Sequence, residues 1–123
     1  MPKNEYGEPL DRNGYAPSIV QTQLDWCWQC RKRFPDYLER HEVLGAANRA
    51  KSKRLGLWVH LCPECHRTGK KAVHSSCESA LKLKQAAQTA AMEEYGWSTE
   101  DFIREIGKNY LEENNAEQDR FAR

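Results

Sequence analysis

Four of the five cysteines form two Cys-x-x-Cys pairs, and this pattern restricts the fold more than any other feature of the sequence. The pairs are Cys27–Cys30 and Cys62–Cys65, and Cys77 is left over. A Cys-x-x-Cys turn directs two thiolates to one point, and two such turns supply the tetrahedral four-sulfur set that zinc favours. The sequence therefore predicts a structural Zn²⁺ bound by these four cysteines.

Other uses of the cysteines are less compatible with the sequence. Disulfides need an oxidising compartment, and the N-terminal stretch MPKNEYGEPL has no apolar signal region. A thioredoxin-like pair needs a βαβ setting, which the pattern of residues does not show. An iron–sulfur cluster also takes four cysteines. The run Cys62-Pro-Glu-Cys65-His66 matches a c-type haem motif, but haem would leave the first pair unexplained. Zinc is the interpretation we favour.

The spacing of the pairs predicts a β-hairpin between them. Cys30 and Cys62 are separated by 31 residues, more than the 15–20 of a simple two-turn site. Residues 37–43 and 57–61 resemble short strands, and we expect a polar basic loop with at most one helical turn to join them. The order of turn, hairpin and helix is that of a treble-clef finger.

Two helices are predicted after the second pair. Residues 76–95 are rich in good helix formers and end before Gly96. Apolar residues every three to four positions predict a second, amphipathic helix that runs to about Leu111. The expected N-terminal caps are Ser75 with Glu78 for the first helix and Ser98 with Asp101 for the second.

These elements predict one small α+β domain. Residues 1–24, with several prolines and glycines, form an irregular or disordered arm, residues 25–111 form the zinc-stapled domain with its two C-terminal helices, and residues 112–123 form a polar tail. A metal staple suits a folded part of this size, whose core is small. A membrane span needs about 20 apolar residues, and the longest uncharged apolar run is Leu55–Leu61. We therefore expect no membrane span and a cytoplasmic location.

The charge distribution is uneven and suggests a nucleic-acid partner. Residues 31–84 carry a net charge of +8, whereas the rest of the chain carries −7. A basic middle between acidic flanks is typical of a surface that binds DNA, although a solvated surface gives the same pattern. The residues that we expect to contact the DNA backbone are Arg49, Lys51, Lys53, Arg54, Arg67, Lys70 and Lys71.

Three histidines lie where chemistry could use them. His41 is on the first predicted strand, His66 directly follows the last paired cysteine, and His74 precedes the long helix. Imidazole binds divalent metals and can take up a proton near neutral pH. His60 alternates with Trp58 on the second strand, and we interpret it as a structural or exposed residue.

The run CWQC…HEVLGAANR…GLWVHLCPECH…VH resembles the HNH endonucleases, also called ββα-metal or His-Me fingers. The resemblance is greatest to the small phage and prophage proteins of the Ref type (recombination enhancement), and it extends from Cys27 to Leu111. It implies a DNA nuclease that holds one divalent metal (Mg²⁺, Mn²⁺ or Zn²⁺) between hairpin and helix. His66 and His74 would bind the metal, the strand histidine His41 would activate water, and Asn48 would brace the loop.

The sequence departs from the family at the first strand. Many HNH proteins have His-His or Asp-His there, the first residue binding metal and the second acting as base. The neighbours of His41 are Arg40 and Glu42. Either His41 is the base, which we favour, or His41 binds metal and Glu42 acts as the base. Asn48 also lies earlier than the usual position of the family's asparagine, where this chain has Leu57.

Two functions follow as hypotheses. The first is a metal-dependent HNH endonuclease that hydrolyses DNA phosphodiester bonds in phage or prophage recombination or DNA processing, inside a bacterial host cell. The Ref resemblance implies that cutting requires a RecA filament or a displaced strand. The alternative is a non-catalytic zinc-finger module that binds DNA, in which the three histidines are incidental.

Overall fold

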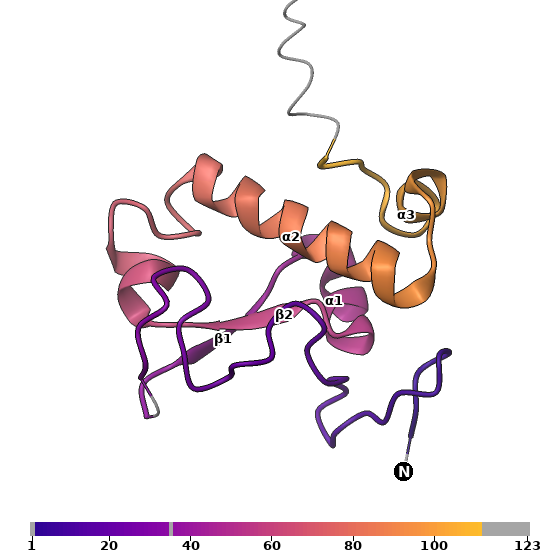
Figure 1. Cartoon of the computed structure of the whole chain (residues 1–123), viewed down its shortest axis with the longest axis horizontal. Coiled ribbons are helices and arrows are strands. Elements are labelled where there is room, and N and C mark those ends of the chain that lie inside the picture. Colours follow the sequence, from indigo (N-terminus) through magenta and orange to yellow (C-terminus); the bar gives the residue numbers. More distant parts are fainter. Residues whose placement is uncertain (1, 35, 112–123) are drawn as a thin grey trace, which may run out of the picture.

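The computed structural model describes residues 2–34 and 36–111 of the chain. Within them a β-hairpin and three α-helices form a small α+β fold (Figure 1). The predicted polar tail, 112–123, lies outside the described residues. In chain order the main elements are β1 (Glu39–Glu42), α1 (Arg49–Leu55), β2 (Trp58–Leu61), α2 (Cys77–Tyr95) and α3 (Thr99–Ile106).

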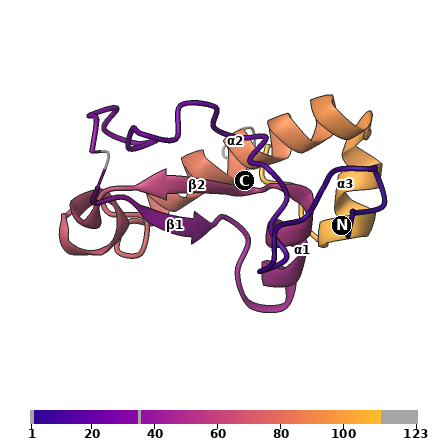
Figure 2. The same cartoon turned by 90° about the horizontal axis from the view of Figure 1, so that it is seen from below.

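The hairpin has the two strands that the sequence predicts, each slightly shorter. β1 and β2 pair antiparallel, with His41 opposite Val59 and Glu39 opposite Leu61 (Figure 2). Side chains alternate between the two faces of a strand, so Glu39 and His41 share one face and Arg40 faces the other. Val59 and Leu61 pack into the core beneath α2, which crosses that same face (Figure 1).

The segment between the strands is more helical than predicted. A 3₁₀ turn, Ala46–Asn48, leads directly into the two-turn helix α1. The arginines, lysines and alanine of this segment are good helix formers, and Leu55 and Ser52 are buried on its inner side. The Ser52 hydroxyl donates to the carbonyl of Leu44 and accepts from its N–H at 3.0 and 2.8 Å. These two hydrogen bonds fix the middle of α1 against the segment that follows β1.

The two C-terminal helices begin and end with recognisable caps. Ser98 and Asp101 form the predicted capping box of α3, and Gly96 ends α2 in the left-handed conformation as predicted. The predicted cap of α2 was wrong by one residue, because Ser76 rather than Ser75 accepts the N–H of Ser79.

The second helix is shorter than predicted. α3 stops at Ile106 because Gly107 adopts a left-handed φ of 103°. The chain then turns back onto α2, where the N–H of Tyr110 donates to the buried side chain of Gln88 at 2.8 Å. The segment that was predicted as the last helical turn thus supplies a hydrogen-bond partner to the buried amide of Gln88.

The N-terminal arm, 1–24, is irregular as expected, since its described residues form no helix or strand. These residues nevertheless lie against the domain. The Asn4 side chain donates to the carbonyl of Arg54 at 2.8 Å, and the N–H of Ala16 donates to Lys53 at 2.9 Å. The Tyr6 ring stacks on Tyr95 at 4.2 Å. No helix in the described ranges is long and apolar enough to cross a membrane.

Gly56 joins α1, β2 and the arm, and we predict that it tolerates no side chain. Its φ is +76°, and a Cβ atom would lie 2.2 Å from the carbonyl oxygen of Pro17. Gly96 is a matched control, because its φ is +68° but a Cβ there meets nothing within 4 Å. We expect Gly96→Ala to lower the free energy of unfolding by about 1 kcal/mol through backbone strain. Gly56→Ala should cost a further ~1–3 kcal/mol because of the clash with Pro17. Urea denaturation of both variants would measure these costs. Equal losses of stability in Gly56→Ala and Gly96→Ala would contradict the close contact at Gly56.

Candidate metal centres

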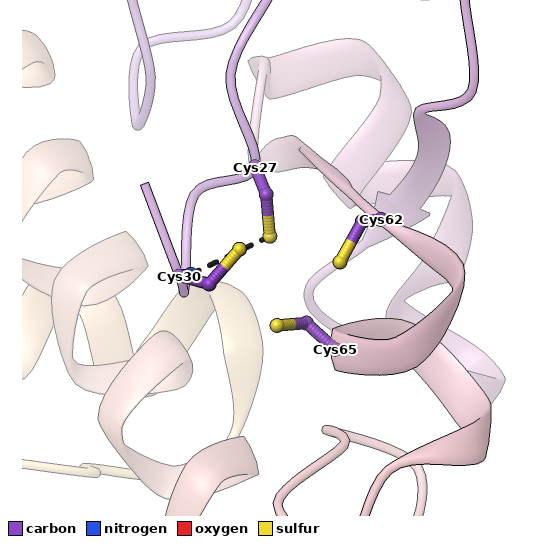
Figure 3. Close-up of side chains that lie close together, drawn as sticks. All are labelled: Cys27, Cys30, Cys62 and Cys65. Carbon is purple, nitrogen blue, oxygen red and sulfur yellow. Dashed lines mark hydrogen bonds between the residues drawn. The ribbon is translucent and has the colours of Figure 1, made fainter. Parts of the chain in front are cut away.

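The four cysteines of the two Cys-x-x-Cys pairs meet in one cluster. The sulfur atoms of Cys27, Cys30, Cys62 and Cys65 lie within 4.8 Å of one another. Figure 3 shows them pointing toward a common centre from the two turns that carry them. Four Zn–S bonds in a tetrahedron place the sulfur atoms about 3.8 Å apart, so this cluster could hold a metal ion of that kind. All five cysteines of the chain are free thiols in the structure.

A tight turn forms the first half of the cluster. The N–H of Arg31 donates to the carbonyl of Cys27 at 2.9 Å, and Arg31 takes a left-handed φ of 67° to close the turn. The N–H of Cys30 is directed at the sulfur of Cys27, 3.5 Å away. Burial raises the pKa of Cys27, but hydrogen bonds from the backbone of Cys30 and Cys62 outweigh it and lower that pKa. The turn therefore favours a thiolate at Cys27.

The second half of the cluster comes from the end of β2 and the turn after it. This turn, Glu64–Thr68, is π-helical and begins after Pro63. Burial and the neighbouring thiols of Cys27 and Cys62 raise the pKa of Cys65. Thiolates this close repel one another, and a bound cation is what allows all of them to ionise.

The three predicted histidines form a second cluster. His41 comes from β1, His66 from the π-helical turn, and His74 from the segment before α2. Their ligand nitrogens lie within 4.8 Å of one another, and the Nε2 atoms of His66 and His74 are 3.0 Å apart. Three Zn–N bonds of tetrahedral geometry place the nitrogens about 3.3 Å apart. This cluster, too, could hold a metal ion.

Glu39 fixes the orientation of His66. Its Oε1 atom lies 2.6 Å from Nδ1 of His66, whose side chain is 6% exposed. A carboxylate that accepts from Nδ1 keeps the proton there and leaves the lone pair on Nε2. That nitrogen is the one directed at His74, so the pair presents a metal-binding nitrogen to the cluster.

The surroundings keep the other two imidazoles neutral. Burial, with the neighbouring His66 and His74, lowers the pKa of His41 to about 4. Burial and the nearby His66 also lower the pKa of His74. A neutral imidazole is the form that binds metals, so the rings have the required protonation state near neutral pH.

The two clusters are linked through the backbone. Cys65 and His66 are consecutive residues of the π-helical turn, and each belongs to a different cluster. The N–H groups of Val73 and His74 donate to the carbonyls of Cys65 and His66 at 2.8 and 3.2 Å. The placement of the histidines therefore depends on the fold of the cysteine cluster.

The histidines lie in a cavity of about 590 Å³, called here the histidine pocket. Four cationic side chains and one carboxylate also line it. They belong to Arg40, Arg49, Arg67, Lys84 and Glu42. These cations lie around side chains that could hold a metal ion, an arrangement that suits an anionic ligand such as a phosphate.

Glu42 is held by two hydrogen bonds. It accepts from the hydroxyl of Tyr15 and, at 3.0 Å, from Nε of Arg49. Burial raises the pKa of Glu42, but the bonds from Tyr15 and Arg49 outweigh it and hold the pKa below its usual value. Glu42 is therefore ionised at neutral pH and fixed beside His41.

Asn48 ends the 3₁₀ turn and connects two elements. Its side-chain amide donates to the carbonyl of Ile106, the last residue of α3, at 2.9 Å. The amide thus ties the segment after β1 to the C-terminal helix. The family resemblance implies that this asparagine braces the loop, and in the structure its amide is directed toward α3.

The seven basic residues predicted to bind DNA lie in different places. Arg49 and Arg67 line the histidine pocket, whereas Lys70 and Lys71 line a separate cavity beside Glu64. Three others contact the protein itself: Lys51 donates to the carbonyl of Glu105, the ammonium group of Lys53 lies 4.9 Å from the Tyr15 ring centroid, and Arg54 pairs with Glu5 at 3.0 Å.

Sequence reasoning did not place Lys84, Arg40 or Tyr15 at the pocket. Lys84 and Ala80 both line it and are four residues apart in α2, so they share one face of that helix. This spacing could have identified Lys84, since α2 begins just after His74. Arg40 was considered only as a neighbour of His41. Tyr15 is 26 residues before His41 in an irregular segment, and no local pattern indicates it.

The Glu39–His66 contact yields a testable prediction. We expect Glu39→Ala to weaken Mn²⁺ binding at the histidines by about 10–100-fold, because losing a carboxylate that orients a ligand has effects of that size. Isothermal titration of protein that holds one zinc ion per chain would measure this change. The control is Glu78→Ala, which removes a carboxylate whose side chain is 81% exposed at the start of α2. Equal affinities for both variants would contradict the orienting role of Glu39.

Comparisons with models of protein families, with curated proteins and with solved structures found no match for this chain.

Proposed function

We propose that this protein is a metal-dependent endonuclease of the HNH type that hydrolyses DNA phosphodiester bonds. The observation that carries the proposal is the convergence of His41, His66 and His74 in one pocket lined by cations. The histidines come from a β-hairpin and from the segment that leads into α2, the arrangement that the family resemblance implies. The neighbouring cysteine cluster would bind a structural zinc ion and hold both parts together.

The histidines are the proposed ligands of the catalytic metal. We assign His41 to this set, because its nitrogen meets those of the other two histidines. This assignment differs from the preference for His41 as the base. A divalent ion held there would offset the negative charge that develops on the phosphate oxygens. Of the three metals that the family resemblance implies, Zn²⁺ is the one that imidazole ligands suit best.

Glu42 is then the proposed general base. It is ionised, it lines the pocket, and it follows His41 directly in β1. It would accept a proton from the attacking water as the new bond between oxygen and phosphorus forms. The bond from phosphorus to the leaving oxygen breaks, and solvent protonates that oxygen. Proton acceptance by a positioned carboxylate contributes about 10²–10⁴-fold to such reactions.

The cations of the pocket would bind the DNA backbone. Arg49 and Arg67, two of the residues expected to contact DNA, line this pocket, and Arg40 and Lys84 add two more positive charges. Contacts of this kind recognise phosphate and not base sequence. We therefore expect cleavage with little sequence preference. A role in phage or prophage recombination with a RecA filament, within a bacterial cell, is supported by the sequence resemblance alone.

A cleavage assay tests this function. Single-stranded, duplex and displaced-loop DNA would each be incubated with the protein and Mg²⁺, Mn²⁺ or Zn²⁺, with and without RecA. His66→Ala is the inactivating variant, and His60→Ala is its control, because His60 lies on β2 and contacts the carbonyl of Leu24 at 2.8 Å. We expect wild type and His60→Ala to cut and His66→Ala not to cut. Binding of DNA without cleavage in every condition would instead favour a non-catalytic zinc-finger module.

A further inference from the structure

Tyr15, from the N-terminal arm, reaches into the histidine pocket. Its hydroxyl donates to Oε2 of Glu42, while Arg49 occupies Oε1. The guanidinium of Arg40 lies 3.9 Å from the Tyr15 ring centroid and 4.3 Å from that of Trp58. One side chain of the arm thus contacts both the carboxylate and one of the cations of the pocket.

The arm is built to hold Tyr15 in this place. The Asp11 carboxylate accepts the N–H of Tyr15 at 3.0 Å, and the N–H of Asp11 donates to the Tyr15 carbonyl at 2.9 Å. The next residue, Ala16, is tied to α1 through Lys53 and accepts the indole N–H of Trp58 at 2.8 Å. The backbone on both sides of Tyr15 is therefore fixed to the hairpin and to α1.

The charges of Glu42 and Arg40 explain what the contacts with Tyr15 do in the pocket. Glu42 carries a negative charge in a pocket that would bind an anion. Its Oε1 atom pairs with Arg49, and the Tyr15 hydroxyl holds its other oxygen. Burial and the contact with Glu42 raise the pKa of Tyr15, so its hydroxyl remains a donor at neutral pH. The rings of Tyr15 and Trp58 hold the Arg40 guanidinium at the pocket. A flexible arginine would lose conformational freedom on binding phosphate, whereas an arginine that is already held in place loses less.

We infer that Tyr15 is a positioning residue of the pocket, which fixes Glu42 through its hydroxyl and Arg40 through its ring. The N-terminal arm thereby completes the site for a phosphodiester ligand. This inference rests on the proposed nuclease function. It assigns the two halves of one side chain to two measurable steps: the ring to phosphate binding through Arg40, and the hydroxyl to the chemical step through Glu42.

Two substitutions separate these roles. Tyr15→Phe keeps the ring and removes the hydroxyl, so we expect kcat to fall about 10-fold with KM unchanged. This loss is smaller than the roughly 10²–10⁴-fold that the proton acceptor itself contributes, because Glu42 remains in place. Tyr15→Leu removes both the ring and the hydroxyl. Because the ring–guanidinium contact with Arg40 is lost, we expect this variant also to bind a short single-stranded oligonucleotide about 5–10-fold more weakly. Tyr37→Phe is the control, because Tyr37 is 72% exposed and outside the pocket. Zinc content and thermal unfolding would confirm that each variant is folded.

Double variants distinguish positioning from a general effect on the fold. If Tyr15 acts through Glu42, Tyr15→Phe should cause no further loss of rate in a Glu42→Gln protein. If it acts through Arg40, Tyr15→Leu should cause no further loss of affinity in an Arg40→Ala protein. Additive losses in both cycles, or single variants that match wild type, would overturn the inference.

The outcomes also separate this inference from the proposed function. A wild-type protein that cuts DNA, with Tyr15 variants that cut and bind equally well, overturns only the role of Tyr15. A wild-type protein that binds the oligonucleotide without cutting it, while Tyr15→Leu binds more weakly, overturns the nuclease and the role of the hydroxyl, and supports the role of the ring. A wild-type protein that neither binds nor cuts overturns both.

Discussion

Cys27→Ser is expected to abolish the folded state. Cys27 is completely buried and contributes one of the four sulfur atoms. Binding of a structural zinc ion is worth about 10–16 kcal/mol in small zinc domains, whereas the whole stability of a domain is about 5–15 kcal/mol. Losing the proposed zinc ion would therefore remove more free energy than the folded state has in reserve. The helical signal in circular dichroism and the zinc content per chain should fall together.

Cys77→Ser is the control for this experiment. Cys77 is exposed at the first residue of α2 and lies outside the cluster. Its substitution should change the free energy of unfolding by less than about 0.5 kcal/mol. A Cys27→Ser protein that kept its native helical signal and unfolded at the wild-type temperature would contradict a structural role for the metal.

A second experiment separates the two roles considered for His41. If His41 binds the metal, His41→Ala should lose most of its affinity for Mn²⁺ and its activity together. Glu42→Gln should keep that affinity, while its kcat falls about 10²–10⁴-fold, because the proposed proton acceptor is gone. Isothermal titration gives the affinity, and single-turnover cleavage gives the rate.

The reverse result is equally informative. His41→Ala that binds Mn²⁺ as tightly as wild type but does not cut would make His41 the base, as the sequence alone favoured. Glu42→Gln would then retain most of its activity. Only these two variants together distinguish the alternatives, because both are expected to reduce cleavage.

The cysteine cluster was predictable from the sequence because its geometry is local. Each Cys-x-x-Cys turn fixes two sulfur atoms within four residues, and the hairpin between the turns follows from the length of the intervening segment. The caps at Ser98 and Gly96 were predictable for the same reason, since a cap depends on residues three or four apart.

Features that depend on tertiary contacts were not predictable. α1 had no sequence signal strong enough to separate it from a loop, and its inner side is defined by the burial of Leu55 and the Ser52 contacts. α3 ends at Gly107, and no local pattern indicates that the residues after it bind the buried amide of Gln88. Tyr15 reaches its position through contacts between segments that are far apart in the chain. In each case a contact with a distant segment of the chain determines the local structure.

Metal binding and DNA cleavage, measured in the same samples, would test whether the three histidines hold a catalytic metal ion. Wild type and His66→Ala, each holding one zinc ion per chain, would be titrated with Mn²⁺ in the presence of displaced-loop and single-stranded DNA, with RecA added. We predict that wild-type cleavage rises with Mn²⁺ and saturates at one added ion per chain. His66→Ala should bind that ion at least 10-fold more weakly and cut at least about 100-fold more slowly. Equal cleavage by both proteins, or a wild type that binds the second ion and never cuts, would contradict a catalytic metal ion at the three histidines.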